Sequence, residues 1–311
     1  MKLPTRRAAV LAAACLLATA TLAACGGSSG SPKASAGTAN TSVGVNVAGG
    51  FGEKPTLTVP NTPAPAKLTT DVLTRGSGPV VASGQSLIVN YLGQTWQPQN
   101  GKPNVFDNSY DRHQPAAFVI GKKAVIEGWD QGLVGQKAGT RVLLTIPPAL
   151  AYGTAKDASQ PLAGQTLLFV VDVIGSYPTT ATATGRPVGA LPTGFPQVRS
   201  ASGEVPSVTS VKNVELGKTP RSALLIQGTG PVIDADKNLV VQVLQVDART
   251  GKPIQSTWTA AGPQPLSGAQ AVKAVTALRN AHLGSRAVVL SPAPQAGQPG
   301  VVVVVDVIGE F

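Results

Sequence analysis

The chain has 311 residues, of which 42% are apolar and 13% charged, and its formal net charge is +10. That length allows about two domains and a tail, and the scattered basic residues, without interleaved aromatic side chains, exclude a nucleic-acid groove. With only two Cys and two His, a disulfide framework and a zinc cluster are also excluded, and we expect no cofactor.

The chain begins with a positively charged stretch followed by an apolar one. The charges are Lys2, Arg6 and Arg7, and residues 8–24 are apolar apart from two Thr. This apolar run is short for a transmembrane helix and is typical of a secretory signal. Leu22-Ala23-Ala24-Cys25 resembles a bacterial lipobox. The resemblance implies a signal peptide over 1–24, lipidation of Cys25, and location on the extracytoplasmic face of the cell membrane, held by a lipid anchor. An uncleaved anchor and plain secretion are the alternatives.

Two segments are rich in small residues and poor in bulky apolar ones. Residues 25–50 and residues 178–198 consist largely of Gly, Ser, Ala, Thr and Pro. Such segments bury too little surface to offset the entropy of ordering them. We therefore expect a flexible tether over 25–50 and a linker over 178–198.

The segments on either side of this linker match each other. DVLTRGSGPVV at 71–81 matches ALLIQGTGPVI at 223–233, LIVNYL at 87–92 matches LVVQVL at 239–244, and VVDVIG at 170–175 recurs at 304–309. Because the matches keep the same order, they indicate an internal duplication. It predicts two domains, one over 51–177 and one over 199–311.

Each copy shows the pattern of an α+β fold. In the first copy, β-branched runs separated by Gly, Pro and Asn turns predict antiparallel strands over 87–92, 115–120, 141–146 and 166–174. Ile126, Trp129 and Leu133 have helical spacing and predict one short helix. The expected fold is a small antiparallel sheet wrapped around that helix, present twice.

The first copy also contains a series of specific motifs. In order, these are Tyr91-Leu92-Gly93, Val105-Phe106-Asp107, Val125-Ile126-Glu127-Gly128-Trp129, Gly135-Gln136-Lys137, Ile146-Pro147-Pro148 and Ala151-Tyr152-Gly153. In content, order and spacing, residues 67–175 resemble the FKBP-type peptidyl-prolyl isomerases, the macrolide-binding immunophilin family. The resemblance implies isomerase activity without nucleophile, metal or cofactor, in a pocket between helix and sheet.

By this resemblance the pocket consists of nine residues: Tyr91, Phe106, Asp107, Phe118, Val125, Ile126, Trp129, Tyr152 and Phe169. It implies that Trp129 forms the floor, and that the Ile126 N–H and the Tyr152 hydroxyl donate to substrate carbonyls. Arg112 matches the arginine that pairs with Asp107. Two departures from the family concern specificity: Ala116 replaces an aromatic wall, and the loop after Tyr152 is polar with Leu162 as its apolar lip.

The second copy has lost the residues of this pocket. Aligned by position, Val243 replaces Tyr91, Ile254 and Gln255 replace Phe106 and Asp107, Ala274 or a neighbour replaces Trp129, and Val303 replaces Phe169. No Tyr matches Tyr152. Val272, Val275 and Leu278 still form an apolar helical face. We therefore expect a degenerate FKBP-like domain that folds and lacks isomerase activity.

These observations lead to two functional hypotheses. The first is a membrane-tethered peptidyl-prolyl cis-trans isomerase that acts on Pro-containing segments of exported proteins, with a macrolide as a candidate ligand. The second is a non-catalytic chaperone or scaffold that only binds such segments. His113 and His282 lie in different copies and are expected to be surface or hydrogen-bonding residues.

Overall fold

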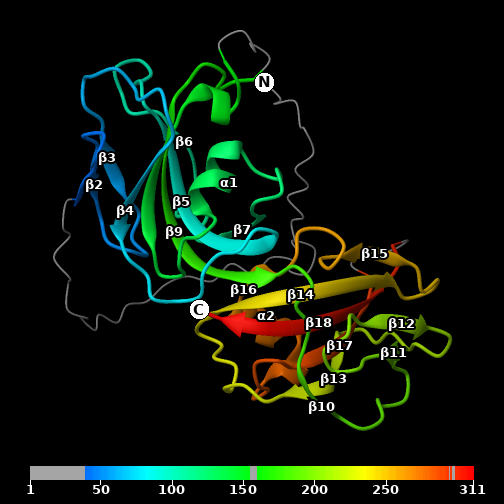
Figure 1. The fold of residues 1–311 in the computed structure, drawn as a ribbon. Helices are drawn as coiled ribbons and strands as arrows, with labels where there is room; N and C mark the ends of the chain where they lie inside the picture. Colours follow the sequence, from blue (N-terminus) through cyan, green and yellow to red (C-terminus); the bar gives the residue numbers. More distant parts are fainter. Residues whose placement is uncertain (1–38, 155–159, 294, 296–297) are drawn as a thin grey trace, which may run out of the picture.

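The computed structural model describes residues 39–154, 160–293, 295 and 298–311, and Figure 1 shows two halves, each built on an antiparallel sheet. The predicted signal peptide, Cys25 and the first part of the predicted tether lie outside the described residues. Among the residues described, no helix is both long and apolar enough to cross a membrane.

The first half contains a six-stranded sheet with one short helix on it. The strand order is β4 (Thr69–Thr74), β8 (Arg141–Ile146), β9 (Leu167–Pro178), β5 (Gln85–Thr95) and β6 (Val105–Asn108), and β7 (Ala116–Val119) also pairs with β5. The helix α1 (Glu127–Leu133) lies against one face of this sheet (Figure 1), and the 3-10 turn η1 (Pro148–Leu150) follows β8. The four strands and the helix expected from the sequence are all present.

Two glycines allow α1 to lie close to the sheet. A Cβ atom at Gly128 would collide with the side chain of Ile146, and one at Gly132 with that of Leu144. Ile146 and Leu144 are fully buried on β8, in the same cluster as Trp129 and Leu133 of the helix. The glycines therefore set the distance between helix and sheet, so that Trp129 reaches the core.

The other face of the first sheet is covered by a segment that the composition assigned to the flexible tether. Strands β1 (Ala39–Asn40), β2 (Asn46–Ala48) and β3 (Thr56–Thr58) form a three-stranded sheet over residues 39–58, which we call the strap. Val45 and Val47 are buried against Leu143 and Val170 of the main sheet. The expectation of a flexible tether reaching residue 50 is wrong from residue 39 on, because alternating valines supply the buried surface that the average composition hides.

The second half repeats the strand order of the first. Its sheet contains β10 (Gly185–Pro187), β13 (Arg221–Gly228), β17 (Arg286–Ser291), β18 (Val301–Glu310), β14 (Asn238–Asp247) and β15 (Pro253–Ser256), and β16 (Gln264–Ser267) pairs with β14. The helix α2 (Gly268–Ala274) and the turn η2 (Thr276–Leu278) pack on it, and β11 (Gln197–Arg199) pairs with β12 (Ser207–Ser210). Without β10, each main sheet has six strands in the same arrangement.

The segment predicted as a linker is bound to the second half. Residues 179–183 are hydrogen-bonded along the sheet by Gln242, Trp258 and Asp306. Strand β10 then pairs with the outer edge of β13. Residues 178–198 are therefore not a free linker in this structure, because main-chain groups of 179–187 are hydrogen-bonded to the second half and Leu191, Phe195 and Val198 pack against its buried cluster.

An ion pair between an arginine and an aspartate lies buried in each half. Arg141 Nε donates to Asp172 at 2.6 Å, and both side chains are almost wholly inaccessible to solvent. The guanidinium also donates to the carbonyls of Gly49 and Glu53 in the strap, at 2.6 Å each. The second half repeats the arrangement with Arg286, whose guanidinium binds Asp306 and a carbonyl of the preceding loop. Each pair thus joins two central strands to the segment that covers them.

We predict that Arg141→Met lowers the free energy of unfolding by about 3–5 kcal/mol, because it leaves the Asp172 carboxylate buried without its counter-ion. Urea unfolding followed by tryptophan fluorescence would measure this loss. The control is Lys54→Met, which breaks the solvent-exposed Lys54–Asp111 pair and should change the unfolding midpoint little. Equal effects of the two substitutions would contradict a structural role for the buried pair.

Candidate active site

Five aromatic side chains meet between α1 and the first sheet. Tyr91 comes from β5, Phe106 from β6, Phe118 from β7, Trp129 from α1 and Phe169 from β9. The Trp129 ring lies 5.2 Å from Phe118, 5.2 Å from Phe169 and 5.5 Å from Tyr91, each edge to face. These are favoured aromatic geometries. The structure thus places these five residues together, with Trp129 at the centre.

A glycine makes room for two of these rings. A Cβ atom at Gly93 would lie 2.7 Å from ring atoms of both Phe106 and Phe169. The Tyr91-Leu92-Gly93 motif thus combines an aromatic side chain that enters the cluster with a bare backbone two residues later. Any larger residue at Gly93 would displace Phe106 or Phe169.

Asp107 belongs to a closed polar network beside the aromatic cluster. Its carboxylate accepts a hydrogen bond from the Tyr91 hydroxyl at 2.5 Å and another from Arg112 at 2.5 Å, and Arg112 also donates to the Tyr91 oxygen at 2.9 Å. The Arg112–Asp107 pair agrees with the sequence prediction. Because both carboxylate oxygens already have partners, Asp107 acts here by fixing Tyr91 and Arg112 rather than as a free base.

Three donors near the cluster have no partner among the described residues. The Trp129 Nε1–H is buried and unpaired, and neither the Ile126 N–H, just before α1, nor the Tyr152 hydroxyl donates to a described residue. Tyr152 is 39% exposed, whereas Val125 and Ile126 are half-buried against the cluster. A ligand with carbonyl groups could therefore accept hydrogen bonds at this site without displacing existing ones.

The edge of the cluster includes a residue that the sequence did not single out. Leu150 packs against it together with Ala116, Ala151 and Leu162. Leu150 ends the turn η1, which begins at Pro148 of the Ile146-Pro147-Pro148 motif. This motif was therefore the sequence feature that could have indicated Leu150. Among the described residues, no group of three or more His, Cys, Asp or Glu side chains is arranged to hold a metal ion.

The comparisons with known proteins agree with this geometry. The family profile for FKBP-type peptidyl-prolyl cis-trans isomerases matches residues 78–174. An FK506-binding protein of Streptomyces anulatus is 40% identical over 123 residues, which cover 39% of this chain and 96% of the relative. The chain belongs to the FKBP-type peptidyl-prolyl cis-trans isomerase family. Members of this family are peptidyl-prolyl cis-trans isomerases.

Two further comparisons cover a similar share of this FKBP-type chain. A probable FK506-binding protein of Corynebacterium glutamicum is 37% identical over 124 residues, covering 40% of this chain and 99% of the relative. The crystal structure of AtFKBP13 is 35% identical, with coverage of 37% of this chain and 96% of that chain and a TM-score of 0.30.

The equivalent region of the second half is aliphatic. Val243 and Ala274 pack against a buried cluster that includes Val303, at the positions that match Tyr91, Trp129 and Phe169. Ile254, at the Phe106 position, is 53% exposed, and β15 pairs with β14 in the register that β6 makes with β5. The FKBP-type site residues are therefore brought together in the first half, while the second half has the same strand pairing without the aromatic side chains.

We predict that the isomerase rate of this FKBP-type site is flat between about pH 6 and 8. Desolvation by burial raises the pKa of the Tyr91 and Tyr152 hydroxyls above the ordinary value of 10.0, and the Asp107 carboxylate raises both further. A raised pKa keeps each hydroxyl protonated up to and beyond pH 10, so neither donor is lost in the window. The same sign predicts that these two hydroxyls lower the stability of the fold only above about pH 10, where they ionise first in the unfolded chain. A bell-shaped pH–rate profile between pH 6 and 8 would contradict this.

Proposed function

We propose that this protein isomerises X–Pro bonds in exported proteins, using the aromatic cluster of its first half, while a lipid on Cys25 holds it at the outer face of the cell membrane. The observation that supports this most strongly is the interlocked cluster around Trp129, beside unpaired donors at Ile126 and Tyr152. This arrangement combines a dry apolar floor with hydrogen-bond donors for peptide carbonyls.

The chemistry needs no bond to form or break. Rotation about an X–Pro amide meets a barrier of ~18–20 kcal/mol from resonance, and at ~20 kcal/mol the uncatalysed rate is on the order of 10⁻² per second. The twisted transition state has lost the charge separation of the planar amide. An aromatic floor solvates a charge-separated group poorly, so it disfavours the planar form relative to the twisted one.

The donors hold the chain on either side of the rotating bond. A carbonyl bound by the Ile126 N–H or the Tyr152 hydroxyl would be fixed while the proline ring rests on Trp129. The buried Trp129 Nε1–H would gain a partner, which removes a desolvation cost of about 1–3 kcal/mol. A macrolide would compete for the same surface, and Ala116, which is small and half-buried beside it, widens the pocket on that side.

Site variants provide the test of catalysis. We predict that Phe106→Ala and Tyr152→Phe each lower the rate of prolyl isomerisation about tenfold or more, the equivalent of about 1.4 kcal/mol of transition-state stabilisation, while circular dichroism stays unchanged. Proline-limited hydrolysis of a chromogenic peptide measures the rate. Tyr177→Phe is the matched control, because Tyr177 packs on Gly175 and Gly309 away from the cluster. Normal binding of Pro peptides without rate acceleration by the unmodified protein would favour the non-catalytic chaperone instead.

The double variant Phe106→Ala, Tyr152→Phe tests the second half as well. In the full chain it should lower the rate about a hundredfold or more, because the second half has aliphatic residues at the positions that match Tyr91, Phe106, Trp129 and Phe169. A loss in the double variant no larger than that of either single variant would show that the second half has a site of its own.

The anchor is tested at Cys25. We predict that Cys25→Ser abolishes incorporation of labelled fatty acid and leaves the protein unprocessed or released, because the thiol is the acylated atom in the proposal. Metabolic labelling followed by membrane fractionation measures both effects. Acylation of the Cys25→Ser variant at the normal level would refute the proposed anchor.

A further inference from the structure

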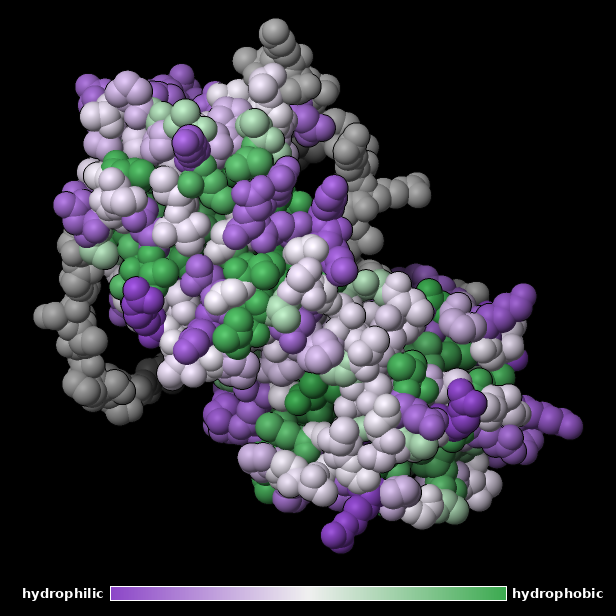
Figure 2. All heavy atoms as spheres, in the orientation of Figure 1, coloured by the Kyte–Doolittle hydropathy of each residue, from purple (hydrophilic) through white to green (hydrophobic). Residues whose placement is uncertain are grey.

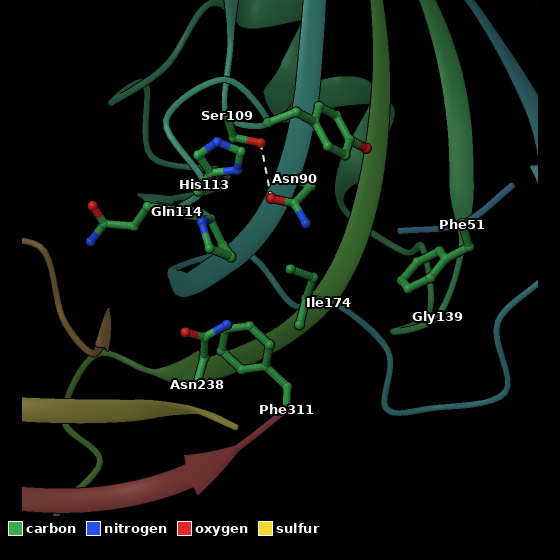
Figure 3. A pocket seen from close by; sticks show the side chains of 11 residues that line it. Phe51, Asn90, Ser109, His113, Gln114, Gly139, Ile174, Asn238 and Phe311 are labelled. Carbon is green, nitrogen blue, oxygen red and sulfur yellow. Dashed lines mark hydrogen bonds between the residues drawn. The ribbon is translucent and has the colours of Figure 1, made fainter. Parts of the chain in front are cut away.

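A cavity lies on the face of the first sheet that points away from α1. It has a volume of about 560 Å³ and lies between the two halves, lined by Phe51, Asn90 and Ile174 of the first half and by Asn238 and Phe311 of the second. Figure 3 shows Asn90 and Ile174 pointing into this opening, with Phe311 on the opposite side. Asn90 is next to Tyr91 on β5, so the two side chains lie on opposite faces of the sheet.

The matching surface of the second half is occupied by the chain itself. Gln242 Nε2 donates to the carbonyls of Thr179 at 2.8 Å and Ala181 at 3.2 Å, and Trp258 Nε1 donates to the Ala181 carbonyl at 2.9 Å. Gly262 lies against Thr179. An extended segment of this chain is therefore held by its main-chain carbonyls.

Main-chain donors hold the other end of that segment. The Ala183 N–H donates to Asp306 at 2.6 Å, and the Thr184 N–H donates to the Gly284 carbonyl at 3.0 Å. The segment then continues as β10, which adds a strand to the edge of β13. Thr179–Pro187 thus binds as a peptide binds a groove and an adjoining sheet edge.

The two surfaces correspond residue by residue. Asn90 takes the position of Gln242, and each side-chain oxygen accepts a hydrogen bond from a hydroxyl, that of Ser109 for Asn90 and that of Thr257 for Gln242. These hydroxyls in turn accept from the main-chain N–H groups of Tyr91 and Val243. Gly139 matches Gly284, because Gly-Thr-Arg at 139–141 aligns with Gly-Ser-Arg at 284–286. Ile174 matches Ile308, because VVDVIG occurs at 170–175 and at 304–309.

In the first half the groups that would hold such a segment have no partner. Among the described residues, none accepts a hydrogen bond from Asn90 Nδ2 or donates one to the Gly139 carbonyl. Strand β4 matches β13, and within the part of the chain that the structure describes it is the last strand on its side of the sheet, with no counterpart of β10. One contact differs, because the Gly52 N–H of the strap already donates to Asp172 at 2.7 Å.

The cavity is part of a fixed arrangement of the two halves. The Tyr177 ring packs against both Gly175 and Gly309, where a Cβ atom would come within 3.2 Å and 3.0 Å of it. The Ser86 hydroxyl donates to the Pro263 carbonyl at 2.8 Å in a buried contact. Figure 2 shows that the apolar residues on the face in view form separate patches rather than one continuous surface.

We propose that this cavity binds an extended, uncharged polypeptide segment with small side chains from another protein, as Thr179–Gly185 is bound in the second half. Asn90 Nδ2 and the Gly139 carbonyl would pair with its main chain, and Phe51 and Ile174 would cover it. Among the described residues that line the cavity, none is Lys, Arg, Asp or Glu, so a charged segment would lose its hydration without gaining a counter-ion from them.

The chain supplies its own probe. A fluorescein-labelled peptide with the sequence of residues 179–185, Thr-Thr-Ala-Thr-Ala-Thr-Gly, has no charged side chain, and it contains no proline and so is not a substrate for the isomerase site. Its binding to the full chain in detergent is measured by fluorescence anisotropy. We expect saturable binding that is weakened about tenfold by N-methylation of the amide matching Thr184, which removes one main-chain hydrogen bond worth up to about 1.5 kcal/mol.

Protein variants locate the binding. Ile174→Trp fills the cavity and should weaken binding about tenfold or more, whereas Ile254→Trp, the same change at an exposed position on β15, should alter it by about twofold or less. Asn90→Asp keeps the oxygen that accepts from Ser109 and removes the donor, so it provides a second test if Ile174→Trp destabilises the fold. Binding should persist in Phe106→Ala, which separates this proposal from the isomerase function. Absence of saturable binding, or equal affinity in Ile174→Trp, Asn90→Asp and Ile254→Trp, would overturn the proposal.

Discussion

The buried ion pair between Arg141 and Asp172 is the interaction on which the first half depends. A guanidinium and a carboxylate removed from water are tolerable only when every remaining donor and acceptor is satisfied. The strap satisfies Arg141 through two carbonyls, and the Tyr110 hydroxyl donates to Asp172 at 3.0 Å. Tyr110 follows β6, which carries Phe106 and Asp107. The hydrogen bonds of this buried pair therefore hold the strap on one face of the sheet. Through Tyr110 they also fix the end of β6 at the edge of the candidate site.

The second half contains an equivalent buried ion pair, but the surfaces on the two sides of its sheet differ from those of the first half. Arg286 and Asp306 reproduce the pair, and the preceding loop again supplies a carbonyl. The second half keeps the ion pair and the strand order. Its sheet positions that face α2 are aliphatic, and they still form a buried hydrophobic core. On the opposite face, Asp306 accepts the Ala183 N–H, and a stretch of the chain between the halves lies where the first half has an open cavity. The two halves thus share the strand order and the buried ion pair, and they differ in the helix-facing surface and in the surface on the opposite side of the sheet.

Much of the fold could be predicted because its signals are local. The β-branched runs and the spacing of Ile126, Trp129 and Leu133 place four strands and α1. The strap was missed since three valines among small polar residues carry little weight in an average composition, although Val45 and Val47 are buried. The segment 179–187 was missed for a different reason. Its contacts are made by main-chain carbonyls and N–H groups, which every residue type has.

The sequence by itself determined the duplication, the aromatic positions of the first half and their loss in the second, because these are statements about side-chain type and order. Only the tertiary structure decided what each polar group is free to do. Asp107 looks like an available carboxylate in the sequence, yet Tyr91 and Arg112 occupy both of its oxygens. Asn90 looks like a strand residue matching Gln242, yet its amide faces an open cavity while that of Gln242 holds a peptide segment. Hydrogen-bond partners distant in sequence make this difference, and no local pattern encodes them.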